Sequence, residues 1–298
     1  MRRLVLGVAF PSCNLDEKLI KQARKKLDKL NIDLYITDLN PVEAESPFRY
    51  SPETRARELE GLFQNEKVNA IICARGGFGA QHIVKHLNLD IIKQNPKILI
   101  GYSDATILLN LIYQHTGLIT QHGPMLKEIA LTDDNVFLKS LYKIITSNFK
   151  SLLKSEHIKQ GQIMNEGKAS GNLVGGNLSM VCSGLGTEYE ISFKNNVIFL
   201  EDVGEELYRI DRLISTLADN NKIFAANAII FGNFNDMQNK NLRYKRELKD
   251  IVAKHLQAFQ GPILWNYPAG HKDCTKFLPI GEKVEIELTG KDKILRYL

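Results

Sequence analysis

Short apolar runs alternate with helical patterns through the first half of this 298-residue chain. Leu4–Phe10, Ala70–Ala74 and Lys97–Ile100 have the length and composition of buried strands, and amphipathic helical patterns span Leu15–Leu30 and Pro52–Gln64. Strands that are apolar on both faces occur in parallel sheets covered by helices on both sides. The sequence therefore predicts an α/β fold whose functional residues collect at the carboxyl ends of the strands.

The pattern changes near residue 150, which predicts two domains. Residues 149–168 are polar and lack a core pattern, so we expect a linker that contains at most one strand. On this interpretation, residues 1–148 form an N-terminal domain with a parallel sheet. Residues 169–298 form a smaller, mixed α/β C-terminal domain that ends in a β-hairpin.

The predicted strand Lys97–Ile100 runs directly into Gly101-Tyr102-Ser103-Asp104-Ala105, and a helical pattern follows. A strand, a Gly-x-Ser-x-Ala turn and a helix together describe a nucleophile elbow, in which the serine projects from the strand tip. Small residues two positions before and after the serine are needed because larger side chains would collide in the turn. The backbone amide of Asp104 would then point toward an oxyanion formed at Ser103.

A serine nucleophile needs a histidine as base and an acid that orients the imidazole. His122 and His271 both lie in loops or strand ends, and their positions alone leave the choice between them open. Glu201 ends the apolar run Val197–Leu200 and is the candidate acid, with Asp202 as a local alternative. From its position alone, a helix N-cap or an ion pair with Arg209 or Arg212 is the favoured interpretation of Glu201.

The glycine-rich segment Arg75-Gly76-Gly77-Phe78-Gly79 follows another predicted strand. It lacks the Gly-Lys-Ser/Thr of a P-loop and the spacing of a dinucleotide fingerprint, so we predict no nucleotide or nicotinamide cofactor. Beside a serine elbow, the Gly77 amide could supply a second oxyanion donor.

Composition excludes several other classes of function. The formal net charge of +5 is spread along the chain without basic runs interleaved with aromatics, so we expect no nucleic-acid partner. The four cysteines are far apart, which argues against a metal site or a disulfide framework. No apolar run has the length of a membrane span, and we expect a cytoplasmic protein without a membrane partner.

Taken together, these segments resemble the LD-carboxypeptidases, a serine peptidase family that includes murein tetrapeptide carboxypeptidases and microcin C immunity hydrolases. The resemblance implies that Ser103 is the nucleophile, Glu201 the acid partner and His271 the general base, and it favours His271 over His122. It also implies an oxyanion hole formed by the amides of Asp104 and Gly77. The motifs that carry it run in order over nearly the whole chain: Ala74–Gly79, Gly101–Thr106, His122–Met125, Gly171–Leu178, Leu200–Glu205, Tyr208–Arg212 and Pro268–His271.

The resemblance further implies a homodimer that releases terminal D-alanine from murein-derived peptides, without a metal, during cell-wall recycling. Either lysine or diaminopimelate could precede the D-alanine. Candidates for binding the substrate are Arg75 with the adjacent Gly76, Arg209 and Arg212, although each arginine could equally be structural. The alternatives are a microcin-immunity-type hydrolase of peptidyl-adenylates, for which Trp265 could stack on a base, and a non-catalytic α/β ligand-binding protein.

Overall fold

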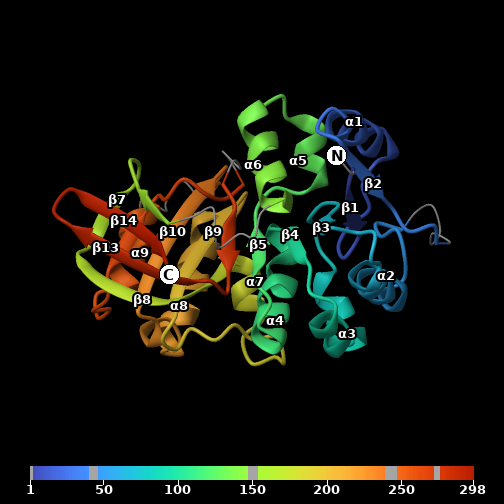
Figure 1. Ribbon diagram of the computed structural model, residues 1–298. Helices are drawn as coiled ribbons and strands as arrows, with labels where there is room; N and C mark the ends of the chain where they lie inside the picture. The colour runs from blue at the N-terminus through green and yellow to red at the C-terminus, as the bar shows by residue number, and fades with distance from the viewer. Residues whose placement is uncertain (1–2, 40–45, 147–153, 239–246, 272–275) are drawn as a thin grey trace. The chain divides into compact units, whose positions relative to one another are not determined.

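The computed structural model describes residues 3–39, 46–146, 154–238, 247–271 and 276–298. The chain forms two compact units (Figure 1), unit 1 comprising Met1–Asn148 with Thr275–Gly281 and unit 2 comprising Phe149–Cys274 with Glu282–Leu298. The predicted α/β class is confirmed, because each unit contains a sheet and helices. The domain boundaries predicted at residues 148 and 169 stay a prediction.

Unit 1 contains a six-stranded sheet in the order β12-β5-β4-β3-β1-β2. The first five strands of the chain run parallel, and only β12 is antiparallel, to β5. Parallel strands need crossover helices, and the strand–helix alternation of the sequence supplies them. The strands are β1 (Leu4–Ala9), β2 (Ile32–Tyr35), β3 (Ala70–Cys73), β4 (Ile98–Gly101), β5 (Thr120–His122) and β12 (Leu278–Ile280).

The helices of unit 1 form two groups. Helix α1 packs on α5, whereas α2, α3 and α4 pack in a row, and Figure 1 shows these groups on opposite faces of the sheet. Helix α2 begins as predicted, with the Ser51 hydroxyl accepting the Thr54 N–H and with Pro52 in the first turn. The helices are α1 (Glu17–Asp28), α2 (Pro52–Gln64), α3 (Leu89–Gln94), α4 (Thr106–Thr116), α5 (Leu126–Leu131) and α6 (Asn135–Thr146), with 3₁₀ helices η1 (Ala80–His86) and η2 (Ser103–Ala105).

Unit 2 contains an eight-stranded mixed sheet in the order β6-β14-β13-β8-β9-β10-β11-β7. Strand β8 is the longest, and it pairs antiparallel with β13 through its first half and parallel with β9 through its second half. The strands are β6 (Ser155–His157), β7 (Gln162–Asn165), β8 (Gly167–Asn177), β9 (Val197–Val203), β10 (Ala228–Asn235), β11 (Ile263–Trp265), β13 (Lys283–Thr289) and β14 (Asp292–Tyr297).

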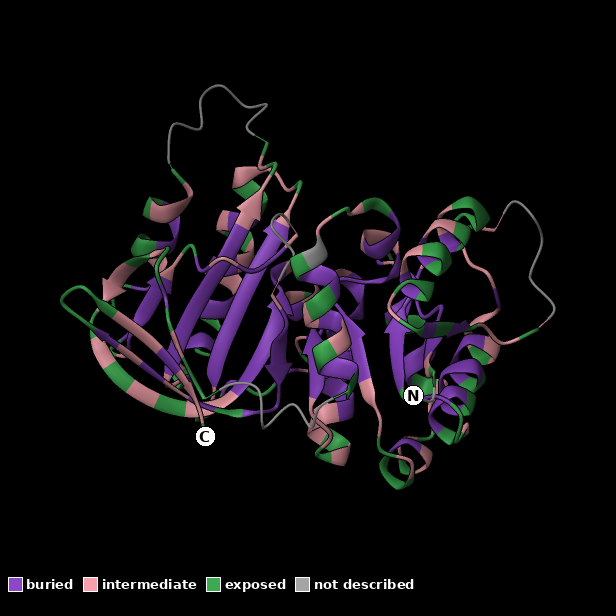
Figure 2. Cartoon of the chain, turned by 45° about the horizontal axis from the view of Figure 1, so that its top comes forward, coloured by how far each residue is buried: buried purple, intermediate pink, exposed green. Residues whose placement is uncertain are grey.

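Helices α7 (Leu178–Ser183), α8 (Leu207–Asp219) and α9 (Leu248–His255) pack in a row in unit 2, and η4 (Ile223–Ala225) precedes β10. Figure 2 shows the central strands of both units as buried and the outward helix faces as exposed. The predicted C-terminal hairpin is present as β13 and β14. Two strands, β6 and β7, fall within residues 149–168, where the sequence predicts a linker. Each pairs only at an edge of the sheet, so neither needs the apolar pattern of a central strand.

Candidate active site

Ser103 stands at the tip of β4, where the chain turns through η2 into α4. Its φ of 58° lies in the left-handed region, which is uncommon for a residue with a side chain and is typical of a strained nucleophile elbow. A Cβ on Gly101 would lie 2.9 Å from both the Ala105 Cβ and the Cys73 Sγ. The turn therefore has room only for small residues two positions from the serine, and the predicted elbow is confirmed.

The glycine-rich loop after β3 lies directly against the elbow. A Cβ on Gly76 would come within 2.9 Å of the Ser103 Oγ, so only glycine lets the backbone approach the hydroxyl this closely. Gly77 has a φ of 113°, and a Cβ there would lie 2.7 Å from the Cys13 Sγ. The backbone of this loop is thus held close to the Ser103 hydroxyl.

Glu201 and His271 form a hydrogen-bonded pair in unit 2. Glu201 lies in the buried strand β9 and is 0% exposed, and His271 follows β11 in a loop. The His271 Nδ1 lies 2.7 Å from the Glu201 Oε2. Burial raises the pKa of Glu201, and the hydrogen bond with His271 opposes that rise. Gly270, with a φ of 140°, brings the loop within reach of this carboxylate, because a Cβ there would lie 3.2 Å from the Glu201 Oε2.

His122, the other candidate base, ends β5 beside Gly101 in unit 1. Its side chain is buried, and its ring packs against Tyr102 with the centroids 6.0 Å apart and the planes at 72°. This is the environment of a core histidine. The arrangement favours His271 as the base, because its Nδ1 contacts the buried Glu201 carboxylate.

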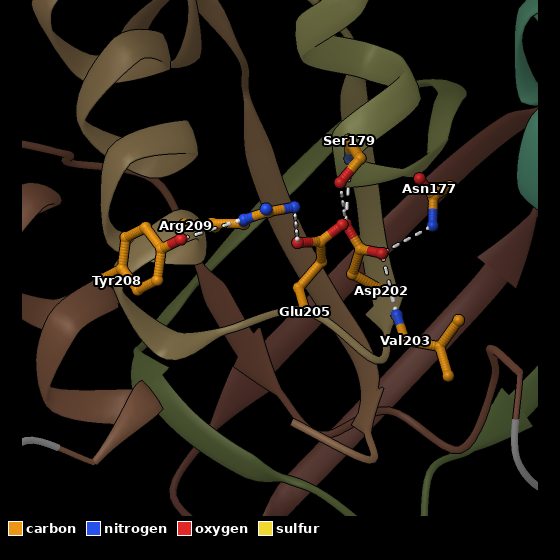
Figure 3. Close-up of polar contacts among 7 residues, drawn as sticks. All are labelled: Asn177, Ser179, Asp202, Val203, Glu205, Tyr208 and Arg209. Atoms are coloured by element: carbon orange, nitrogen blue, oxygen red, sulfur yellow. Dashed lines mark hydrogen bonds and ion pairs between the residues drawn. The ribbon is translucent and has the colours of Figure 1, made fainter. Parts of the chain in front are cut away.

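Asp202, the local alternative to Glu201, is occupied by four hydrogen-bond donors (Figure 3). Its Oδ1 accepts hydrogen bonds from the Asn177 Nδ2 at 2.9 Å and the Val203 N–H at 2.8 Å. Its Oδ2 accepts from the backbone N–H and the hydroxyl of Ser179, at 3.0 and 2.7 Å. Asp202 thus joins β9 to the first turn of α7, which is a structural role. The sequence signal that could have revealed it is Asn177, which caps α7 from the end of β8.

The candidate substrate-binding arginines differ in their surroundings. Arg209 is exposed and contacts Glu205 at 3.5 Å and the Tyr208 hydroxyl at 3.3 Å (Figure 3), and Arg212 lies over the Tyr208 ring at 5.6 Å. Asp211 pairs with His255 at 2.5 Å. Arg75, in the glycine-rich loop, is half-buried, and within the described part of the chain its enclosed Nε has no hydrogen-bond partner.

Comparison with known proteins shows which family this chain belongs to. Residues 6–123 match the LD-carboxypeptidase N-terminal domain and residues 170–286 match the LD-carboxypeptidase C-terminal domain. A probable murein peptide carboxypeptidase of Bacillus subtilis is 33% identical, over 97% of this chain and 91% of its own length. The chain belongs to the LD-carboxypeptidase family. It is a serine carboxypeptidase.

Two further relatives show the breadth of the LD-carboxypeptidase family. The microcin C7 self-immunity protein of Escherichia coli is 29% identical over 80% of this chain and 76% of its own length. The crystal structure of a muramoyltetrapeptide carboxypeptidase from Oxalobacter formigenes has a TM-score of 0.87 at 20% identity, covering 98% of each chain. The fold is therefore shared by proteins whose names indicate different substrates.

The described residues of this LD-carboxypeptidase contain no group of three or more His, Cys, Asp or Glu side chains that could hold a metal ion. No helix among them has both the length and the apolar character needed to cross a membrane.

Proposed function

We propose that this carboxypeptidase releases terminal D-alanine from murein-derived tetrapeptides during cytoplasmic cell-wall recycling. The observation that carries the proposal is the 2.7 Å contact between His271 and the buried Glu201, in a chain whose Ser103 occupies a strained elbow. These are the three residue types of a serine hydrolase triad, in the order Ser-acid-His. The names of the relatives from Bacillus subtilis and Oxalobacter formigenes support a peptide of the cell wall as substrate.

In the proposed reaction, His271 accepts the hydroxyl proton of Ser103 through Nε2 while Glu201 holds its Nδ1–H. The Ser103 Oγ attacks the carbonyl of the amide that joins the diamino acid to D-alanine. The resulting oxyanion accepts hydrogen bonds from the backbone amides of Gly77 and Asp104. His271 then gives its proton to the nitrogen of the leaving D-alanine. Water, deprotonated by His271, hydrolyses the ester and restores the Ser103 hydroxyl.

The free carboxylate of D-alanine needs a cationic partner, and we propose Arg75 for this role. Of the three candidate arginines, Arg75 is separated from Ser103 by the fewest residues, and it lies in the same loop as Gly76 and Gly77. Its enclosed Nε, which lacks a partner among the described residues, supports the assignment, because an unsatisfied buried donor is costly until a ligand pairs with it. Arg209, by contrast, already contacts Glu205.

Hydrolysis of peptidyl-adenylates is the second candidate, supported by the similarity to the Escherichia coli self-immunity protein. A base would need an aromatic surface, and Trp265 lies shortly before His271. The Trp265 ring stacks on Phe234, with centroids 5.9 Å apart and planes at 8°, so one face of the indole is already covered. The polar segment between Asn235 and Arg243, whose lack of aromatics favours a wall peptide, extends into residues 239–246, which lie outside the described residues.

The test is D-alanine release from an L-Ala-D-Glu-diaminopimelate-D-Ala tetrapeptide, compared with hydrolysis of a peptidyl-adenylate by the same preparation. We expect release from the tetrapeptide and no effect of a chelator. The same peptide with lysine in place of diaminopimelate shows which diamino acid is preferred. Hydrolysis of the adenylate alone would move the assignment to the second candidate. We also propose a homodimer, which predicts a solution mass of twice 33.7 kDa by light scattering.

A further inference from the structure

Two buried charged side chains connect the loops that follow β1, β3 and β4 in unit 1. Asp104, the residue after Ser103, is 3% exposed, and Arg55 of α2 is fully buried. Burying charged groups costs free energy, and a hydrophobic pair of the same volume would stabilise the unit as well or better. Their presence beside an active-site loop therefore needs an explanation other than stability.

The Asp104 carboxylate joins the elbow to the two neighbouring loops. Its Oδ2 accepts a hydrogen bond from the Ser12 hydroxyl at 2.5 Å and another from the Ala80 N–H at 2.8 Å. Ser12 lies in the loop after β1 and is itself fully buried, and Ala80 follows directly after the glycine-rich loop. One carboxylate oxygen thus fixes both loops to the residue beside the nucleophile.

The Arg55 guanidinium joins the same two loops from the other side. Its Nη1 donates to the Pro11 carbonyl at 2.5 Å and to the Gly79 carbonyl at 3.1 Å. Its Cζ lies 4.3 Å from the centre of the Phe48 ring, which covers the cation. The guanidinium also attracts the Asp104 carboxylate. Burial raises the pKa of Asp104 above its usual value, and the two hydrogen bonds and the Arg55 charge oppose that rise without cancelling it.

The loop held in this way lies against the Ser103 hydroxyl. Gly76 lies against the Ser103 Oγ and Gly77 lies against the Cys13 Sγ, so the two glycines are confined between the elbow and the loop after β1. Oxyanion donors work only when they sit at hydrogen-bond distance from the developing charge, and a displacement of about 1 Å can cost about 100-fold in rate.

We propose that the Asp104 side chain, with Ser12 and Arg55, positions the glycine-rich loop so that its amides meet the oxyanion formed at Ser103. The inference rests on the proposed function, because it assumes that Ser103 is the nucleophile. It assigns Asp104 a second part beside its backbone amide. The side chain sets the spacing between the two oxyanion donors without itself touching the substrate.

Asp104→Asn and Ser12→Ala test this role, since both keep every backbone amide. We expect kcat per active site to fall about 10- to 100-fold in each, with KM within about threefold of wild type. Glu60→Gln is the matched control. Glu60 is another buried carboxylate of unit 1 that accepts a backbone N–H, from Asn88, but it lies on the α3 side of α2. This control should retain wild-type kcat.

A purely structural role would lower the melting temperature and the fraction of active protein but leave kcat per titrated site unchanged. Active sites are therefore counted with a fluorophosphonate, and its rate of reaction with Ser103 is a second readout that needs no peptide substrate. Equal labelling rates and equal kcat in wild type, Asp104→Asn and Ser12→Ala would overturn the inference while leaving the proposed function intact. Failure of the wild type to react at Ser103 would refute both. Labelling of the wild type without D-alanine release would refute only the proposed substrate.

Discussion

Replacing Glu201 with glutamine removes the charge beside His271 while keeping the size of the side chain. The carboxylate is 0% exposed and lies 2.7 Å from the His271 Nδ1, so water cannot replace it. A hydrogen bond to a charged group contributes about 1.5–3 kcal/mol. Loss of that term from the transition state corresponds to a rate decrease of about 10- to 150-fold.

The tautomer of His271 adds to this loss. If the glutamine amide points its NH₂ at Nδ1, that nitrogen must accept, and the proton moves to Nε2, which then cannot take the proton of Ser103. The corresponding change in a serine protease triad costs about 10⁴ in kcat. We therefore expect Glu201→Gln to lower kcat about 10²- to 10⁴-fold, with KM changed less than about threefold.

The assay is steady-state D-alanine release from the tetrapeptide, with the fraction of folded protein checked by circular dichroism. Glu201→Asp is the matched control, because it keeps the charge and shortens the side chain by one methylene. It should retain more activity than Glu201→Gln. A Glu201→Gln variant within tenfold of wild-type kcat would refute the idea that Glu201 orients and stabilises His271.

Three other predictions follow from unit 1. Gly76→Ala should lower kcat at least about 100-fold without unfolding the protein, because its Cβ would lie 2.9 Å from the Ser103 Oγ; wild-type turnover would contradict the close approach. Arg75→Ala should raise KM for the tetrapeptide with kcat retained, and unchanged kinetics would reject carboxylate binding. Burial raises the pKa of Glu58 to about 8, so the folded state holds this proton more tightly than the unfolded state. The resulting contribution to stability is complete below about pH 4.5 and is lost as the pH rises through 8. The free energy of unfolding should fall by about 3 kcal/mol between pH 5 and 8 from this group, and urea titrations of Glu58→Gln should lack that part of the slope.

Local patterns in the sequence were enough to predict the parts of the site that depend on one turn. The elbow at Ser103 follows from small residues spaced around a serine between a strand and a helix, and the structure shows the collisions that would exclude larger ones. The Ser51 cap of α2 and the C-terminal hairpin are equally local, since a few adjacent residues determine each.

Contacts between distant segments could not be predicted in this way. Position alone left His122 and His271 as equal candidates, because the carboxylate that distinguishes them is 70 residues from His271 in sequence. The return of β12 to the sheet of unit 1 depends on pairing with β5, more than 150 residues earlier, and no pattern in Leu278–Ile280 specifies that partner. Asp104 accepts hydrogen bonds from Ser12 and Ala80, and these pairings are likewise set by the order of strands in the sheet.

Labelling with a fluorophosphonate, read by intact mass and peptide mapping, tests most directly whether Ser103 is the nucleophile. We predict one adduct per chain, located at Ser103, no adduct in Ser103→Ala, and slow labelling in His271→Ala. D-alanine release should disappear in step with labelling. A preparation that releases D-alanine at the wild-type rate after Ser103→Ala substitution, or that carries its adduct at another residue, would contradict the account.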